Sequence, residues 1–261
     1  RITLYLKNGY DLNLEFKGEK FSDGISFTGN GAETNNFMEN KRSFYMGDLA
    51  NPKTYFKLDK EAYEAKVVEA KSILKGYKDN AINLDSIIYK MDIRNDEMFF
   101  GYIESNYEKI HENIVRFAKG NRSPIFINYE NSNGGTTSLS DLKGKYVYID
   151  VWATWCAPCK AEIPHLKALE KDFHGKNIEF VSISVDKPEA HEAWSQMVKN
   201  EGLSGIQLFA DNNFESAFIA EYEINSIPRF ILLDPEGNIV DADANRPSNP
   251  NLKALFIELG I

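Results

Sequence analysis

The only two cysteines of the 261-residue chain, Cys156 and Cys159, stand three positions apart in the segment TWCAPCK. Two thiols at this spacing can form a structural disulfide, supply half of a zinc site, or act as a redox couple. A disulfide across so short a loop removes little chain entropy and therefore adds little stability. A structural zinc needs four ligands, and the sequence has neither a second cysteine pair nor suitably spaced histidines. The four histidines are His111, His165, His174 and His191. We therefore interpret the cysteine pair as redox-active.

The elements around the cysteines predict how the sulfurs are positioned. The run YVYIDVW, residues 146–152, is almost continuously apolar, as expected of a strand covered on both faces. A helix is predicted directly after it, so Cys156 should stand at a helix N-terminus, where free N–H groups and the helix dipole favour the thiolate. Cys159 follows one turn later on the same face, within reach of a disulfide. Cys156 is thus the predicted attacking group.

Other segments after residue 121 alternate between strand and helix. Apolar runs predict strands at 178–185 and 229–234, and a hairpin is expected around Gly134 and Gly135. The predicted helices follow the cysteines, run from Asp186 as an N-cap to about Glu201, span roughly Phe214 to Tyr222, and close the chain at 251–259. By itself this alternation predicts a mainly parallel sheet.

The first part of the chain has a different pattern. Apolar residues alternate on both sides of Asn8-Gly9, which predicts a β-hairpin, and a strand-like piece follows around Ile25 and Phe27. Helical spacing comes next, with one apolar stripe at Tyr63, Val67, Ala70, Leu74 and Tyr77 and another at Ile103, Tyr107, Ile110, Ile114 and Phe117. The segment KGNRSP, residues 119–124, is the predicted boundary. We predict a smaller α+β domain of unknown role over 1–121 and an α/β domain over 122–261.

The second domain resembles a known family. VYIDVWATWCAPCKAEIPHLKAL is similar to the thioredoxin superfamily, and with the preceding SLSDLKGK it looks most like the TlpA/ResA branch of bacterial envelope thiol-disulfide oxidoreductases. The similarity covers about residues 123–261 and includes Pro164, within the helix after the cysteines, and Pro228 of NSIPRFILLD, which matches the family's cis-proline. It implies a thioredoxin-like fold, with a central mixed sheet flanked by helices and a TlpA-type insertion between Val185 and Pro228.

The resemblance also implies a surface for a partner protein. Ile227 and Pro228 would pack beside Cys156 and offer backbone groups to an extended peptide, as a sheet edge accepts a strand. Trp155, Ala157 and Pro158 would complete this substrate-binding surface around the sulfurs. Without the resemblance, Pro228 reads as an ordinary proline before a strand, because few X-Pro bonds are cis.

Two acids are candidates for a proton-transfer role. Asp150 lies inside the apolar run, where burial should raise its pKa, and it matches the buried acid of thioredoxins. Glu162, three residues after Cys159, matches a glutamate of ResA-like proteins. Either would accept the proton of Cys159 when its thiolate must form. The alternatives are an internally hydrogen-bonded Asp150 and a solvated Glu162 on the helix surface.

These observations predict an enzyme that exchanges disulfides with protein partners and requires no cofactor and no metal. The resemblance implies that it acts more as a reductant than as an oxidant. Its partners would be a client protein and an upstream electron donor. One alternative is a non-catalytic adaptor that only binds a partner. A second is a thiol peroxidase, which needs a threonine three positions before its cysteine, whereas Thr154 stands two before Cys156.

Composition limits the remaining classes of function. Hydrophobic residues at 43% and charged residues at 26% describe an ordinary globular protein. The net charge of −9 argues against nucleic acid, which requires a cationic face. Residues 1–121 carry 18 basic and 19 acidic side chains and the remainder 12 and 20, so the acidity belongs to the second domain.

The family resemblance implies a periplasmic or envelope location. No apolar run reaches the ~18 residues of a membrane span. The chain starts at Arg1 without a methionine, so we expect a processed or truncated form whose targeting peptide or lipid anchor would lie upstream. For the N-terminal domain, which has no cysteine, the candidate roles are client recruitment, dimerisation and spacing.

Overall fold

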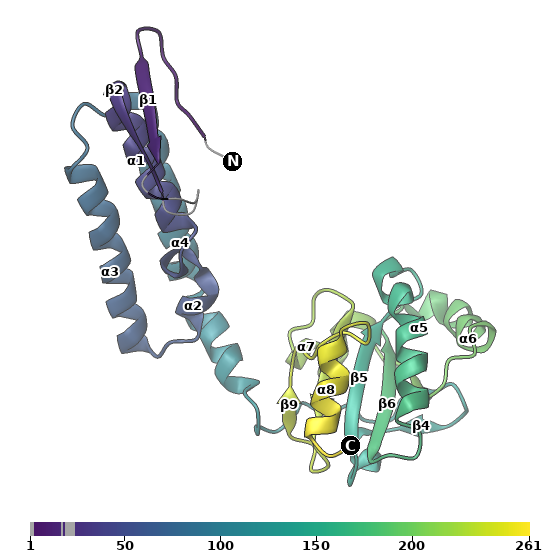
Figure 1. Ribbon diagram of the computed structural model, residues 1–261. Helices are drawn as coiled ribbons and strands as arrows, with labels where there is room; N and C mark the ends of the chain where they lie inside the picture. Colours follow the sequence, from purple (N-terminus) through teal and green to yellow (C-terminus); the bar gives the residue numbers. More distant parts are fainter. Residues whose placement is uncertain (1–2, 17, 19–23) are drawn as a thin grey trace. The chain divides into compact units, whose positions relative to one another are not determined.

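The computed structural model describes residues 3–16, 18 and 24–261 of the chain. The chain divides into two compact units, Arg1–Val115 and Arg116–Ile261 (Figure 1). The division lies shortly before the sequence-based boundary after residue 121. None of the helices within the described residues combines the length and apolarity that a bilayer crossing requires.

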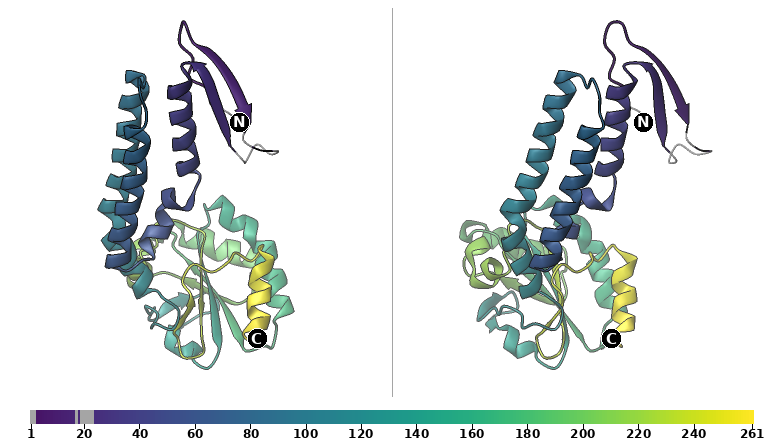
Figure 2. Two further views of the ribbon diagram at one scale, coloured as in Figure 1. Left: turned by 60° about the vertical axis from the view of Figure 1, so that its left-hand side comes forward. Right: turned by 90° about the vertical axis from the view of Figure 1, so that its left-hand side faces the viewer.

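The first unit consists of a small antiparallel sheet and a set of helices. Its strands are β1 (Asp11–Phe16) and β2 (Ile25–Asn30), and the predicted strand around Ile25 is thereby confirmed. The helices α1, α3 and α4 run alongside one another (Figure 2). The helical elements are α1 (Ala32–Tyr45), the 3₁₀ turn η2 (Asp48–Ala50), α2 (Pro52–Phe56), α3 (Lys60–Asp79) and α4 (Ser86–Arg116). This arrangement confirms the predicted hairpin-plus-helices class.

The opening hairpin, however, pairs different residues from those predicted. A turn forms at Asn8-Gly9, but residues 3–7 before it form no strand, and residues 1–2 lie outside the described part. The Asn35 side chain of α1 accepts a hydrogen bond from the Tyr5 N–H at 2.9 Å and donates to the Tyr5 carbonyl at 3.0 Å. Because a helix side chain takes these backbone bonds, β1 pairs with β2 instead. The hairpin predicted around Asn8-Gly9 is therefore wrong.

The predicted apolar stripes form the core of the helical unit only in part. On α3 the stripe is confirmed, because its first four members are buried. Asp59 is the N-cap of this helix, and its side chain accepts from the Ala62 N–H at 2.9 Å. On α4 only the first part of the stripe is buried, at Ile103 and Tyr107. Phe117 lies past the end of α4 and already belongs to the second unit, where it stacks on Tyr222 with ring centroids 5.0 Å apart.

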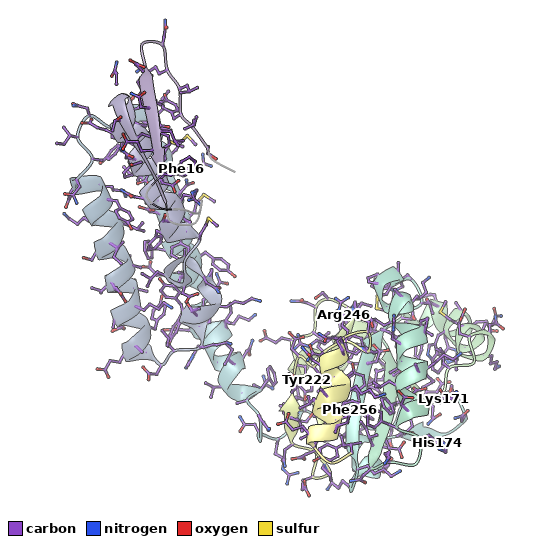
Figure 3. The ribbon with its side chains drawn as sticks, viewed as in Figure 1. Phe16, Lys171, His174, Tyr222, Arg246 and Phe256 are labelled. Carbon is purple, nitrogen blue, oxygen red and sulfur yellow. A yellow bond between two sulfur atoms is a disulfide. The ribbon has the colours of Figure 1, made fainter. Side chains whose placement is uncertain are left out.

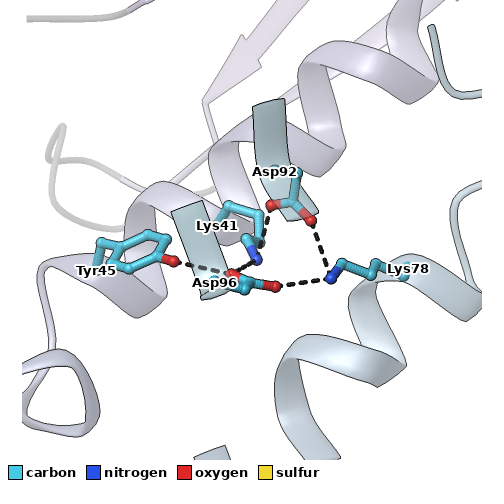
Figure 4. Close-up of polar contacts among 5 residues, drawn as sticks. All are labelled: Lys41, Tyr45, Lys78, Asp92 and Asp96. Carbon is cyan, nitrogen blue, oxygen red and sulfur yellow. Dashed lines mark hydrogen bonds and ion pairs between the residues drawn. The ribbon is translucent and has the colours of Figure 1, made fainter. Parts of the chain in front are cut away.

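A buried group of charged side chains joins the three long helices of the first unit (Figure 4). Lys41 of α1 lies 2.7 Å from Asp92 and 2.5 Å from Asp96 of α4, and Lys78 of α3 lies 2.7 Å from Asp96. The Tyr45 hydroxyl donates to Asp96 at 2.8 Å. Two lysines balance two carboxylates, so the buried charge is compensated. The group fixes how α1, α3 and α4 align.

The second unit is built on one mixed sheet with the strand order β4-β3-β7-β6-β5-β8-β9. Parallel pairing occurs between β5 and β6 and between β6 and β7; the remaining neighbours are antiparallel. The mainly parallel sheet predicted from alternation is wrong, because β3–β4 and β8–β9 are hairpins without a helical crossover. The mixed sheet that the resemblance implied is confirmed, as is the hairpin at Gly134 and Gly135. The strands are β3 (Tyr129–Asn131), β4 (Thr136–Thr137), β5 (Tyr146–Trp152), β6 (Ile178–Ser184), β7 (Ile206–Phe209), β8 (Arg229–Leu233) and β9 (Ile239–Asp241).

Helices cover both faces of this sheet. On one face α5 and α8 pack on alternate strand residues such as Tyr148, and the Phe256 ring of α8 lies in this layer (Figure 3). On the other face α6 and α7 cover the intervening residues, including Val147 and Ile149. The helices are α5 (Ala157–Asp172), α6 (His191–Asn200), α7 (Ala217–Glu221) and α8 (Pro250–Glu258), and the 3₁₀ turns are η3 (Leu139–Leu142), η4 (Pro188–Ala190) and η5 (Asn213–Glu215). The alternation along β5 decides which of its side chains face α5.

Candidate active site

The two cysteines lie where β5 passes into α5. They are joined by a disulfide, with their Cα atoms 5.3 Å apart. Cys156 is the N-cap residue of α5, and its Sγ accepts from the Cys159 N–H at 3.2 Å. This N–H is one of the four at a helix start that lack an intrahelical acceptor. The sulfur of Cys156 therefore occupies the position at which a helix binds negative charge.

Exposed side chains surround the sulfur pair, although the cysteines themselves are only 3% and 4% exposed. Trp155 is 61% exposed, and Ala157 and Pro158 are also exposed. The pairing of β5 with β8 ends at Val151 and Arg229, so Pro228 lies at the same end of the sheet at which β5 leads to Cys156. Ile227 and Pro228 are half-buried, and the peptide bond between them is cis.

Arg229 fixes the start of β8 at this end of the sheet. Its guanidinium donates to the Ala242 carbonyl at 3.0 and 2.7 Å and lies 3.4 Å from the Asp243 carboxylate. Arg229 therefore ties β8 to the segment that follows β9. That segment and Pro228 line a polar hollow next to the cis peptide, which Arg246 also lines (Figure 3).

Asp150 of β5 is buried below the cysteines. It faces α5 and lines a small cavity together with Cys159. Within the described residues its Oδ1 atom has no hydrogen-bond partner. Burial, with smaller contributions from the Glu162 and Glu170 carboxylates, raises the pKa of Asp150 to about 8. The expected rise in the pKa of Asp150 is confirmed, and its cause is desolvation.

Glu162 has a different environment from the solvated one considered as an alternative. It is 9% exposed, and both carboxylate oxygens accept from Ser248, one from the backbone N–H and one from the hydroxyl, each at 2.9 Å. The solvated interpretation is therefore wrong. Glu162 ties α5 to the segment before α8, while Asp150 shares a cavity with Cys159.

Asp186 was expected to cap a helix, and this is wrong. Its buried carboxylate accepts from the Thr154 N–H, the Thr154 hydroxyl and the Ser184 hydroxyl, each at 2.8 Å. The helix it was expected to start begins instead at His191, after η4. Asp186 thus fixes the backbone two residues before Cys156. A pattern of caps cannot reveal this role, because the bond spans 32 positions of the sequence.

No group of three or more histidine, cysteine or acidic side chains in the described part of the chain is arranged to bind a metal ion.

Comparison with known proteins assigns the second unit to a protein family. Residues 120–242 match the AhpC/TSA family. The thiol-disulfide oxidoreductase ResA of Bacillus subtilis is 32% identical over 135 residues, which cover 51% of this chain and 72% of that protein. The chain belongs to the ResA family of thiol-disulfide oxidoreductases.

Two solved structures with the same description align with this part of the ResA-family chain. The thioredoxin domain of a Bacteroides vulgatus thiol-disulfide oxidoreductase is 29% identical, with a TM-score of 0.49 and coverage of 54% of this chain and 97% of that one. A Bacteroides fragilis thiol-disulfide oxidoreductase is 30% identical, with a TM-score of 0.47 and coverage of 53% and 98%. The second unit has the thioredoxin-like fold, and the protein is a thiol-disulfide oxidoreductase.

Proposed function

We propose that Cys156 and Cys159 are the redox couple and that the protein reduces disulfides of protein partners. The observation that carries this proposal is the contact between the Cys156 sulfur and the Cys159 N–H at 3.2 Å, at the first turn of α5. In the reduced protein the same N–H and the helix dipole stabilise a thiolate on Cys156. A thiolate is the form that attacks a disulfide.

The cycle balances as two exchanges. The Cys156 thiolate attacks one sulfur of the partner disulfide, forms a mixed disulfide, and releases the other partner sulfur as a thiolate. Cys159 then loses its proton, attacks Cys156 and closes the internal disulfide, which releases the second partner thiolate. The partner gains two electrons and the couple loses two. An upstream dithiol donor then reduces the Cys156–Cys159 disulfide again.

Asp150 is the better supported acceptor for the Cys159 proton. It lines the same cavity as Cys159 and has an oxygen without a partner among the described residues. Both oxygens of Glu162 are occupied by Ser248. We therefore assign Glu162 a positioning role on α5 and the proton transfer to Asp150.

The partner is proposed to lie as an extended segment over the rim of Trp155, Ala157 and Pro158 and along Ile227 and Pro228. The backbone at Ile227 lies at the end of the sheet where β5 leads to Cys156. A partner chain bonded to this backbone brings its own sulfur over Cys156. By resemblance to ResA-like proteins we place this activity in the bacterial envelope, with the first unit as a recruiting, dimerising or spacing domain.

Insulin reduction tests the redox role. The wild-type protein should reduce insulin with dithiothreitol as donor, and Cys156→Ser should abolish turnover because no thiolate can start the exchange. Cys159→Ser should instead retain a partner as a mixed disulfide that mass spectrometry identifies. The double variant is the control for capture that does not involve sulfur. Turnover by Cys156→Ser would disprove the proposal.

The same experiment separates the two alternatives. An adaptor would bind partners equally well in the wild-type protein and in Cys156→Ser, with no turnover in either. A peroxidase would consume hydrogen peroxide rapidly in stopped-flow measurements. The peroxidase alternative is also disfavoured by structure, because the Thr154 hydroxyl donates to Asp186 at 2.8 Å instead of facing a substrate.

A further inference from the structure

A row of buried polar side chains crosses the sheet below the active site. Asp150 of β5 pairs in register with Ser182 of β6, and Ser182 pairs with Gln207 of β7. Residues opposite one another in a sheet point to the same face, and this face is the one that α5 covers. All three are buried, with 9%, 4% and 2% exposure. Burying three such groups in a row is costly unless they serve one another or a ligand.

A small cavity connects this row to the cysteines. Asp150, Ser182 and Gln207 line it on the sheet side, and Cys159 lines it from α5. Asp150 Oδ1 and Gln207 Oε1 are both buried without a hydrogen-bond partner among the described residues. The space, ≈10 Å³, is close to the minimum that one water molecule requires, and the walls offer it several polar partners. The cavity thus suits a water molecule that bridges these groups.

The far end of the row leads to the surface. The Gln207 amide donates to the Ser204 carbonyl at 2.7 Å, and the Ser204 hydroxyl donates to the Glu170 carboxylate. Glu170 and Ser204 line both the inner cavity and a wide open hollow at the C-terminal end of α5. Glu170 is half-buried, and burial raises its pKa. Gly205 keeps this position open, because a Cβ there would lie 2.9 Å from Glu170 Oε1.

We propose that Asp150, Ser182, Gln207 and Glu170 form a proton path from Cys159 to solvent, in which Glu170 exchanges the proton of Asp150 with the bulk. This inference rests on the proposed role of Asp150 in the thiol-disulfide cycle. Cys159 transfers its proton to Asp150 as its thiolate attacks Cys156. Asp150 then passes a proton through the bridging water, which Ser182 and Gln207 orient, to the Glu170 carboxylate, which lines the same cavity and releases the proton to solvent.

The cycle needs a route by which Asp150 loses its proton, because Asp150, with a pKa of about 8, is mostly protonated at neutral pH. A reduced protein with a protonated Asp150 cannot accept the proton of Cys159. Its base form returns only when that proton leaves the buried site. The ionisable groups that face Asp150 are Cys159, Glu162, Lys167 and Glu170 of α5 and Tyr148 of β5.

The variant Glu170→Gln tests the relay, because it keeps a hydrogen-bonding group of the same size and removes the ionisable one. Fully reduced protein is mixed with a disulfide peptide in a stopped-flow instrument, and resolution of the mixed disulfide is followed from pH 6 to 9. We expect a loss of roughly tenfold near neutral pH, below the ~10²–10⁴ of a direct proton acceptor. A small diffusible base such as imidazole should restore the rate.

The control is Glu179→Gln. Glu179 lines the outer hollow but not the inner cavity, and it pairs with Lys145 on the surface. Its replacement should leave the rate and the pH profile unchanged. A second variant, Gln207→Leu, interrupts the polar row without touching Glu170 and should give the same loss.

The direction of the effect separates a relay from a purely electrostatic role. The Glu170 carboxylate contributes to the raised pKa of Asp150, so its removal lowers that pKa and increases the fraction of carboxylate. If Glu170 acts through its charge alone, Glu170→Gln will resolve the mixed disulfide faster at pH 7, and the relay is disproved. A rate that imidazole does not restore also overturns it.

Failure of the relay is distinguishable from failure of the proposed function. If Asp150→Asn slows resolution while Glu170→Gln and Gln207→Leu match the wild type, only the path to Glu170 is wrong. If Asp150→Asn itself has wild-type kinetics, the assignment of Asp150 as proton acceptor fails and the path has no origin.

Discussion

At the scale of single residues, three buried acids of the second unit have separate roles because their partners differ. Asp186 accepts three hydrogen bonds near Cys156, Glu162 accepts two from Ser248, and Asp150 has an oxygen without a partner among the described residues. For Asp150, burial without such partners raises the pKa to about 8. Acidic side chains therefore anchor distant segments at two positions, whereas the third, Asp150, is the proton acceptor of the proposed cycle.

Asp186→Asn should destabilise the second unit by about 2–3 kcal/mol, because an amide cannot accept from all three donors and leaves buried N–H or O–H groups unpaired. The backbone before Cys156 loses its anchor, so insulin reduction should also fall. Urea unfolding followed by tryptophan fluorescence measures the change, since Trp152, Trp155 and Trp194 all lie in this unit.

Asp172→Asn is the matching control, because Asp172 is half-exposed and pairs with Lys253 at the surface. It should change stability by less than about 1 kcal/mol. Equal midpoints for Asp186→Asn and the wild type would contradict the anchoring role.

At the scale of elements, α5 connects most parts of the site. Its first turn bears the sulfurs, Glu162 binds the segment before α8, and Glu170 near its end faces the outer hollow. In the first unit the corresponding connection is ionic, through the lysines and aspartates between α1, α3 and α4. Each set of contacts links elements that lie far apart in the sequence.

Asp96→Asn should destabilise the helical unit by about 3–5 kcal/mol, because it leaves Lys41 and Lys78 with a single buried carboxylate, that of Asp92. Both lysines hold the pKa of Asp96 below its usual value, against the effect of burial, so this stabilisation is lost as pH falls through the lowered pKa. Far-UV circular dichroism during urea unfolding reports the helices.

The exposed ion pair of Lys75 and Asp79 on α3 provides a control for the buried Asp96. Lys75→Gln should cost less than about 0.5 kcal/mol. If Asp96→Asn costs no more than Lys75→Gln, the buried group does not stabilise the alignment of the helices.

At the scale of the whole molecule, Asp150 should make the stability of the second unit depend on pH. Its pKa is about 8 in the folded protein against 3.8 for the free group, so the native state binds more protons between these values. Stability therefore falls as pH rises from about 4 to about 8 and levels off above that range. Asp150→Asn should reduce this slope and gain about 2–4 kcal/mol at pH 8.

Thermal or urea unfolding at pH 4.5 and pH 8.5, read by tryptophan fluorescence, measures the effect. The free energies of unfolding of the wild type and Asp150→Asn should differ little at pH 4.5 and most at pH 8.5. An Asp150→Asn variant that is less stable than the wild type at pH 8.5 would show that the carboxylate is not penalised by burial.

The sequence predicted those features that depend on neighbours along the chain. The apolar runs of β5, β6 and β8, the stripe on α3 and the spacing of Cys156 and Cys159 are all local patterns. Two of the errors arose where a distant side chain takes over a local bond. The Asn35 side chain takes the backbone hydrogen bonds of Tyr5. The Asp186 carboxylate binds Thr154 instead of capping the helix that follows it in the sequence.

The polar row is another feature that the sequence could not disclose. Ser182 and Gln207 are ordinary residues in their segments, and only the register of β5, β6 and β7 aligns them with Asp150. The family resemblance identified Asp150 and Pro228, but it contains no information on Glu170.

In the proposed cycle, the burial of the sulfurs below their exposed rim would act as a steric filter. A disulfide on the flat surface of a globular protein would not reach Cys156, because Cys156 is only 3% exposed whereas the neighbouring Trp155 is 61% exposed. A substrate would instead present its disulfide on a protruding or unfolded stretch of chain. Selectivity between clients would then depend less on their sequence than on how readily that stretch detaches from its own fold.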